Sequence, residues 1–129
     1  MRIAKEDVNV QMQIPGATLR LQKGFGDVRG YDAISAEFFS LKEGVDTTPL
    51  FIGLEGDMCQ CPHWGYVIAG RITTTDAGGV NETVTSGDLF YWPPGHNVRI
   101  DEDAEFVMFS PQREHIHVID HMQAKVEEG

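Results

Sequence analysis

The chain has 129 residues, the length of a single domain whose core is large enough to fold without disulfide bonds. Its 10 basic and 20 acidic residues give a net charge of -10, so its surface would repel nucleic-acid phosphates and anionic lipid head groups. Small molecules or other proteins are the expected partners. The charged residues 1–7 do not resemble a signal peptide, and no apolar run is long enough to span a bilayer. A cytoplasmic location is therefore expected.

Most of the chain is predicted to form short strands separated by Gly, Pro and Asp. Residues 8–14 and 32–41 alternate between apolar and other side chains, which is the period of a half-buried strand. In the second strand, Ile34, Ala36 and Phe38 form the apolar face. Further strands are expected at 17–23, 49–54, 64–75, 80–85, 89–92, 97–100 and 105–110, with an acidic loop at 101–103. This regular spacing predicts an all-β barrel or sandwich in one domain, 1–129, with residues 1–16 as an extension that covers a sheet edge.

The end of the chain predicts a short amphipathic helix over residues 111–127. Ser110 is the expected helix cap, and Pro111 suits the first helical position. Apolar residues then recur at helical spacing at Ile116, Ile119, Met122 and Val126. His117 and His121 share one face of this helix, and their charged neighbours favour a solvated face over a metal site.

Two cysteines and a histidine form the motif most indicative of chemistry. Cys59, Cys61 and His63 stand at i, i+2 and i+4, so in an extended segment their side chains project from one side. His96 follows a Trp-Pro-Pro-Gly turn at residues 92–95 and is the expected fourth donor. A Cys₂His₂ set suits zinc first, with iron as the main competitor.

Residues 61–66 read Cys-Pro-His-Trp-Gly-Tyr, and this signature resembles the small single-domain bacterial cupins. Gly70 lies seven positions after His63, which places His63 at the glutamate position of the first cupin motif, Cys59 at its second histidine and Asp57 at its first. Gly87, Pro93 and Gly95 match the spacing of the second cupin motif. The resemblance covers residues 38–111. The resemblance implies a jelly-roll barrel with a short C-terminal helix and a homodimer.

The three histidines and one glutamate that usually bind metal in cupins are absent from their usual positions. In particular, Val98 stands where the second motif has its histidine. The resemblance therefore implies a rearranged metal site made of Cys59, Cys61, His63 and His96. It does not identify a reaction, because cupins include enzymes, sensors and binding proteins.

Several alternatives remain open at this stage. The two thiols can simply fill the core, form a strained redox pair, or include a nucleophile activated by His63. Asp57 can join the metal site or stay outside it. The function is thus either a metal-binding barrel, including a small-molecule metalloenzyme, or a non-catalytic binding or redox-sensing module. Aromatic residues near the motifs are expected to line an apolar pocket, to pack in the core or to form an interface: Trp64, Tyr66, Tyr91 and Trp92. Arg71 and Arg99 either hold a carboxylate substrate or make surface ion pairs.

Overall fold

The computed structural model describes residues 1–128, which form seven strands and one long helix. The strands are β1 Val10–Ile14, β2 Ala17–Gln22, β3 Ile34–Leu41, β4 His63–Asp76, β5 Asn81–Thr85, β6 Leu89–Trp92 and β7 His96–Pro111, and the helix is α1 Gln112–Glu128. Three short 3-10 turns lie at Lys5–Asp7, Thr48–Leu50 and Glu55–Asp57. None of the helices in residues 1–128 is long and apolar enough to cross a membrane.

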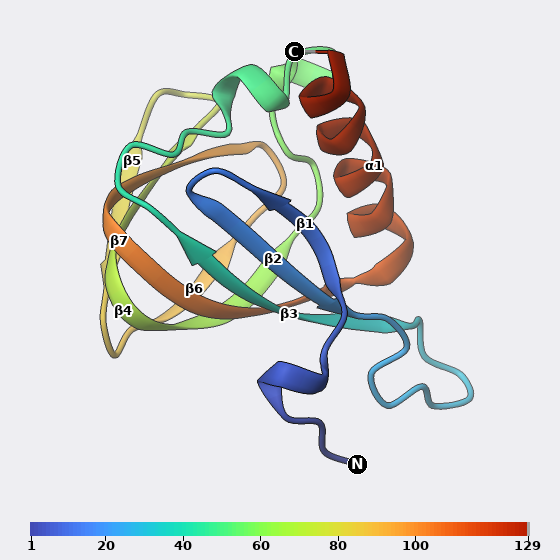
Figure 1. Cartoon of the computed structure of the whole chain (residues 1–129). Coiled ribbons are helices and arrows are strands. Elements are labelled where there is room, and N and C mark those ends of the chain that lie inside the picture. The colour runs from blue at the N-terminus through green and yellow to red at the C-terminus, as the bar shows by residue number, and fades with distance from the viewer. Residues whose placement is uncertain (129) are drawn as a thin grey trace.

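The strands form one antiparallel sheet that curls into a barrel (Figure 1). Its order is β1-β2-β3-β7-β4-β5, and β6 pairs with the first part of β4 beside β5. This confirms the all-β barrel with a C-terminal helix that the strand pattern predicted. β1 lies at one edge of the sheet.

The long ladder between β4 and β7 bends in its middle. Trp64 pairs with Phe109 near one end of the ladder and Asp76 pairs with His96 at the other, with register shifts between Val67 and Ile72. Gly70 lies in this bend with φ +92°, and a Cβ there would collide with the Asp103 carbonyl. β7 runs without a break from His96 to Pro111, so the acidic residues 101–103 lie within one continuous strand. The prediction of a loop there is wrong.

Two other predictions fail for local reasons. Residues 49–54 form no strand, since Pro49 cannot donate to a sheet and Gly53 has φ +101°. In β3 the alternation is present but its phase is opposite to the prediction. Ser35 and Glu37 are buried at 0% and 2% exposure, whereas Ile34 is 38% exposed.

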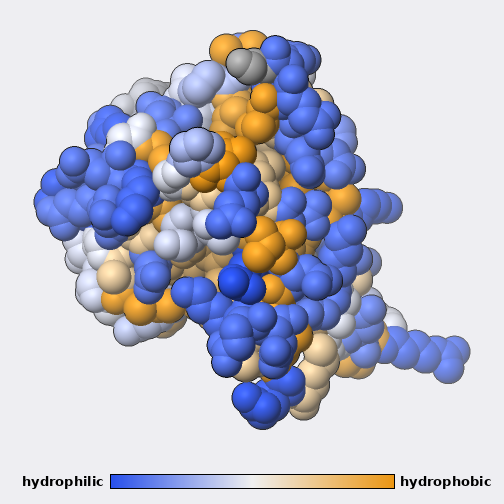
Figure 2. Space-filling model, in the orientation of Figure 1, coloured by the Kyte–Doolittle hydropathy of each residue, from blue (hydrophilic) through white to orange (hydrophobic). Residues whose placement is uncertain are grey.

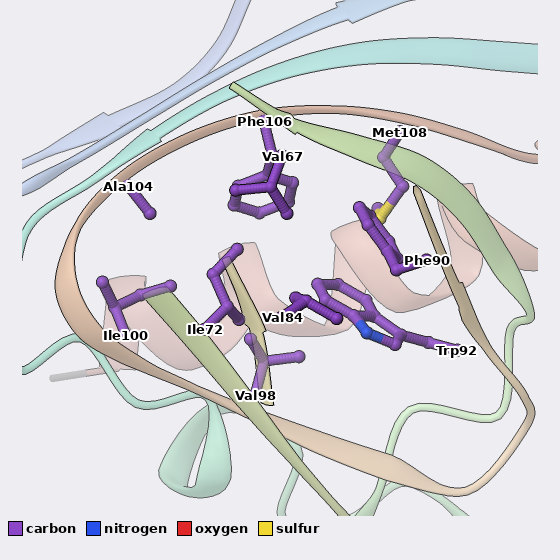
Figure 3. Close-up of a cluster of buried hydrophobic side chains, with 10 residues drawn as sticks. All are labelled: Val67, Ile72, Val84, Phe90, Trp92, Val98, Ile100, Ala104, Phe106 and Met108. Atoms are coloured by element: carbon purple, nitrogen blue, oxygen red, sulfur yellow. The ribbon is translucent and has the colours of Figure 1, made fainter. Parts of the chain in front are cut away.

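The interior of the barrel is filled by apolar side chains from β4 to β7 (Figure 3). Phe90 stacks on Trp92 with ring centroids 4.0 Å apart, and both rings meet Phe106 edge-on. A second cluster joins Phe51, Cys59 and Cys61 to Val118 of α1. The helix thus packs against the segment before β4, and its outer surface is mostly hydrophilic (Figure 2). Its bounds lie within one residue of those predicted.

Candidate metal centre

Backbone pairing brings Cys59 next to His96. The Cys59 amide donates to the His96 carbonyl at 2.9 Å, and the amides of Gly95 and His96 donate to the Cys59 carbonyl at 2.7 and 3.2 Å. Gly95 has φ +89°, a conformation that suits glycine. His63 begins β4 and pairs with Trp92 at the end of β6. The Trp-Pro-Pro-Gly turn therefore delivers His96 to the same place as His63.

The donor atoms of Cys59, His63 and His96 all lie within 4.8 Å of one another. Cys59 Sγ lies 3.4 Å from His63 Nε2, and the two imidazole rings have centroids 5.2 Å apart. All three side chains are at most 3% exposed. One sulfur and two nitrogens thus converge in a buried pocket, which is a donor set that borderline divalent metals accept.

Each of these two imidazoles is held by a hydrogen bond at Nδ1. His63 Nδ1 lies 2.6 Å from Ser110 Oγ, and His96 Nδ1 donates to the Pro93 carbonyl at 2.7 Å. This arrangement leaves Nε2 of both rings for a ligand, and metal-binding histidines are usually fixed in this way. Ser110 does not cap α1 as predicted, because β7 continues through it to Pro111 and its hydroxyl faces His63.

Cys61 belongs to a second group of donors, with His63 and His115. Residues 59–62 precede β4 and do not form a regular strand, so the alternation expected for Cys59 and Cys61 does not hold there. Cys61 Sγ contacts the carbonyls of Pro62 and Pro111 at 3.4 and 4.0 Å. It also borders an outer cleft of about 430 Å³ beneath α1. The structure therefore divides the four predicted donors between two groups that share His63.

Sequence reasoning did not identify two buried residues of this region, His115 and Glu37. His115 on α1 is 3% exposed, and its Nε2 makes a hydrogen-bond contact with Oε1 of Glu37 on β3. His115 stands three, four and seven residues before Val118, Ile119 and Met122, so it lies on the apolar face of the helix. This spacing is the sequence signal for its burial. No comparable signal marks Glu37, because its predicted strand face had the opposite phase.

Burial sets the protonation of the two imidazoles and the two thiols near the centre. Desolvation, aided by His115 and His96, holds the pKa of His63 well below its usual range, and burial also lowers that of His96 against the opposing hydrogen bond to Pro93. Both rings are thus neutral and able to bind metal. Burial raises the pKa of the Cys59 thiol to about 12 and also raises that of Cys61. Because burial disfavours the thiolate of each cysteine, neither thiol is a ready nucleophile.

The other candidates lie outside the donor groups formed by the described residues. Asp57 accepts a hydrogen bond from the Gly53 amide at 2.9 Å in an exposed turn. His121 donates from Nε2 to the Ile52 carbonyl at 2.8 Å. His117 borders the outer cleft. These three residues therefore lie outside the candidate metal centre.

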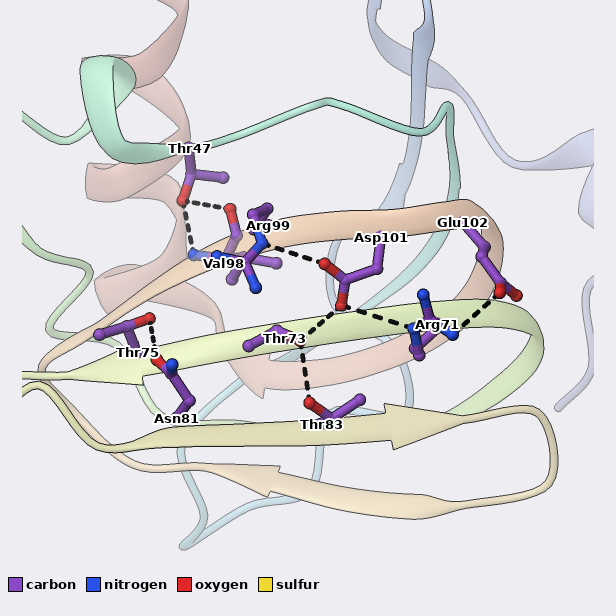
Figure 4. Close-up of polar contacts among 10 residues, drawn as sticks. All are labelled: Thr47, Arg71, Thr73, Thr75, Asn81, Thr83, Val98, Arg99, Asp101 and Glu102. Atoms are coloured by element: carbon purple, nitrogen blue, oxygen red, sulfur yellow. Dashed lines mark hydrogen bonds and ion pairs between the residues drawn. The ribbon is translucent and has the colours of Figure 1, made fainter.

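The two arginines make ion pairs with acidic residues of β7 (Figure 4). Arg71 Nη1 lies 2.9 Å from Glu102 Oε1, and Arg99 Nε lies 3.0 Å from Asp101 Oδ1. Asp101 also accepts from Thr73, and this hydrogen bond and those with arginine lower its pKa. Surface pairing thus accounts for both arginines without a bound carboxylate.

The aromatic residues divide between the two sides of the sheet. Trp92 is 3% exposed and lies close to His63 and His96, with ring centroids 6.4 and 5.9 Å away. Trp64, Tyr66 and Tyr91 are about half exposed on the outer face. Only Trp92 of the four therefore adjoins the metal centre.

A small cavity of about 60 Å³ adjoins the centre. Cys59, His63, His96 and His115 line it, together with Thr47 and apolar side chains such as Trp92. Among the described residues, no lysine, arginine, aspartate or glutamate lines this cavity. It therefore offers apolar walls and a group of metal-binding atoms on one side.

Comparisons with known proteins identify the fold. No family model matches the chain, and no curated protein matches it. Among solved structures, an RmlC-like cupin from Shewanella frigidimarina aligns over 88% of this chain and 93% of its own, with 18% identity and a TM-score of 0.60. The chain has the cupin fold. This confirms the fold that the resemblance implied, including its jelly-roll barrel.

Other cupin-fold neighbours are enzymes. Ectoine synthase from P. lautus aligns over 86% of this chain and 77% of its own, with 14% identity and a TM-score of 0.60. Bacillus subtilis oxalate decarboxylase, a protein with Mn(II) centres, aligns over 84% of this chain with 23% identity and a TM-score of 0.58. This chain spans only 28% of that decarboxylase. At these identities the comparisons establish the fold alone.

Proposed function

We propose that this cupin binds one divalent metal ion through Cys59 Sγ, His63 Nε2 and His96 Nε2. The observation that carries the proposal is the convergence of these three buried donors within 4.8 Å, with both imidazoles held at Nδ1. Because both imidazoles are neutral at neutral pH, they need no deprotonation to bind. Only the Cys59 thiol must release a proton.

Zinc is the proposed metal, because it accepts sulfur and nitrogen donors in a tetrahedral arrangement. Iron is the main competitor, and the Mn(II) centres of oxalate decarboxylase make manganese a third candidate. The thiolate favours zinc or iron over manganese, which prefers oxygen donors.

We propose that the adjoining cavity binds a small, uncharged molecule next to the metal. A volume of about 60 Å³ admits only a few heavy atoms, and a free carboxylate would lose its hydration there without a basic side chain to replace it. Trp92 lines the cavity, and its Nε1 is buried without a hydrogen-bond partner among residues 1–128, so this N–H would be available to an acceptor atom of the molecule. The metal would supply Lewis acidity, and the chain's own residues would orient the molecule and exclude water. This arrangement favours a metalloenzyme that acts on a small molecule.

The first test is the metal content of untagged protein, measured by inductively coupled plasma mass spectrometry. The wild type should hold about one equivalent of metal, and Cys59→Ser and His96→Ala should each lose most of it. Cys61→Ser is the matched control, because it removes the neighbouring buried thiol that lies in the other donor group. A wild type that stays free of zinc, iron and manganese after attempted reloading would refute the proposal.

The second candidate is a non-catalytic binding or redox-sensing module, and the two free cysteines two positions apart favour it. Its thiols would join on mild oxidation, so a thiol titration would then find no free thiol and would find two after reduction. Burial and the raised pKa of both thiols oppose this chemistry. If both thiols survive oxidation in the metal-loaded protein, the sensing candidate is excluded.

We also propose that the protein is a cytoplasmic homodimer. Two free thiols persist best in a reducing compartment. A second copy is the proposed occupant of the apolar outer face formed by Trp64, Tyr66, Leu89 and Tyr91, which carries no charge in a chain of net charge -10.

A further inference from the structure

The pair formed by Glu37 and His115 is the buried polar feature that the three-donor centre leaves unexplained. Both side chains are nearly inaccessible, and they meet each other from β3 and α1. Among residues 1–128 neither side chain has another hydrogen-bond partner, so Glu37 Oε2 and His115 Nδ1 are buried without one there. Burying such groups is unfavourable, and a native protein that keeps them usually has a ligand, water or ion for them.

His115 has the same relationship to its surroundings as His63 and His96. In each of the three rings one nitrogen is held, by Ser110, by the Pro93 carbonyl or by Glu37, and the other nitrogen faces no protein hydrogen-bond partner except the Cys59 thiol. A carboxylate that holds one ring nitrogen is a typical support for a metal-binding histidine. His115 also lines the cavity beside the centre and lies within donor range of His63 and Cys61.

The two donor groups share His63. Its Nδ1 lies against Ser110 Oγ, so its Nε2 is the atom left free. An ion bound at that nitrogen would lie close to both groups, because the ring centroids of His96 and His115 lie 5.2 and 5.0 Å from that of His63. Cys59, His63, His96 and His115 do not form one group within 4.8 Å, so the His115 ring would approach the ion on binding.

We propose that His115 is a further metal ligand of this centre, bound through Nδ1, and that Glu37 is the positioning residue that holds it. This proposal rests on the proposed function, because it assigns a ligand to the same ion. A donor set of Cys59, His63, His96 and His115 would close the sphere of tetrahedral zinc, and such a zinc would be structural and would not activate the molecule in the cavity. It would leave two positions of a six-coordinate ion, such as iron, for a molecule in the cavity. The helix would then contribute to the centre together with the barrel.

The test compares His115→Ala and Glu37→Gln with His117→Ala, a histidine of the same helix that lies in neither donor group. Apparent zinc affinity is measured by competition with a chromophoric chelator, and the ligand field by the visible spectrum of the cobalt(II) protein. Glu37→Gln should weaken zinc binding by about 10- to 100-fold, and His115→Ala by at least as much. In both variants the cobalt d–d bands should change while the thiolate charge-transfer band of Cys59 remains. His117→Ala should match the wild type in both measurements.

The outcomes separate this inference from the proposed function. If Cys59→Ser and His96→Ala lose the metal while Glu37→Gln and His115→Ala keep wild-type affinity and spectrum, the His115 assignment is overturned and the three-donor centre stands. If the wild type binds no metal, both proposals fail together. Should His115→Ala not fold, Glu37→Gln decides alone, because it keeps the shape of the side chain. An unchanged spectrum in Glu37→Gln would then count against the inference.

Discussion

Burial keeps the two proposed imidazole ligands neutral in the metal-free protein. Their pKa values lie below the usual histidine value of about 6.5, so at acid pH the unfolded chain binds more protons than the folded one. Stability is therefore complete above that value and falls as the pH drops below it. For each ring that stays neutral the loss is about 1.4 kcal/mol per pH unit.

We predict that the metal-free protein becomes easier to unfold with urea between about pH 7 and about pH 5.5. His96→Ala should reduce this pH dependence by the contribution of one ring, since it removes one group that takes up a proton on unfolding. The comparison of the two slopes cancels the titration of carboxylates. Identical slopes in the wild type and the variant would show that His96 is protonated in the folded state.

Ser110 offers a second test at the residue scale. Its Oγ lies 2.6 Å from His63 Nδ1, so Ser110→Ala should weaken zinc binding by about tenfold while the fold remains. Ser35→Ala is the matched control, because Ser35 is the equally buried cross-strand partner of Ser110 and its hydroxyl donates to the Ser110 carbonyl and not to a proposed ligand ring. Chelator competition measures both variants. Equal affinities would show that the hydroxyl does not orient His63.

At the scale of the elements, the bend of the β4–β7 ladder depends on Gly70. Alanine there meets both an unfavourable φ of +92° and the Asp103 carbonyl, whereas Gly79 has φ +80° and open space around its Cβ position. Gly79→Ala should therefore cost about 1 kcal/mol, the strain of the left-handed backbone alone, and Gly70→Ala should cost clearly more. Urea unfolding measures both. A loss at Gly70 no larger than at Gly79 would show that the bend relaxes around the new methyl group.

The strands and the helix differ in how far the sequence predicts them. β6 was predicted with its observed bounds, since Gly87 and Pro93 flank four residues of strand-forming type. The phase of β3 was not, because Ile34, Ala36 and Phe38 are apolar while its inner face carries Ser35 and Glu37. Which face of a strand turns inward depends on its neighbours in the closed barrel, and here the inner face adjoins the proposed metal centre. Apolar alternation therefore predicted the strand and misplaced its inner side.

At the scale of the whole molecule, the outer face of β4 and β6 is the proposed dimer interface. Trp64 pairs with Tyr91 and Tyr66 pairs with Leu89 across the two strands, and Leu89 is 82% exposed. We predict a dimer by size-exclusion chromatography with light scattering. Leu89→Glu should yield a folded monomer, because it places charge in the interface without touching the core.

The control for this prediction is Val80→Glu. Val80 is 65% exposed and lies in the turn before β5, away from the outer face of β4 and β6. It should leave the dimer intact. A monomeric wild type, or a dimer that persists in Leu89→Glu, would exclude this interface.

Local sequence patterns are sufficient to predict the class of fold and the types of donor residue at the centre. Period-two alternation and turn residues are local, so most strands follow from them, and Cys59, His63 and His96 are recognisable as donors from their types and from the turn before His96. Only the tertiary structure decided which donors meet. His63 begins β4 and His96 pairs with the far end of that strand, so they become neighbours because the bent ladder closes on itself. Glu37 and His115 join them from β3 and α1, and no local pattern encodes a contact between side chains that distant segments bring together.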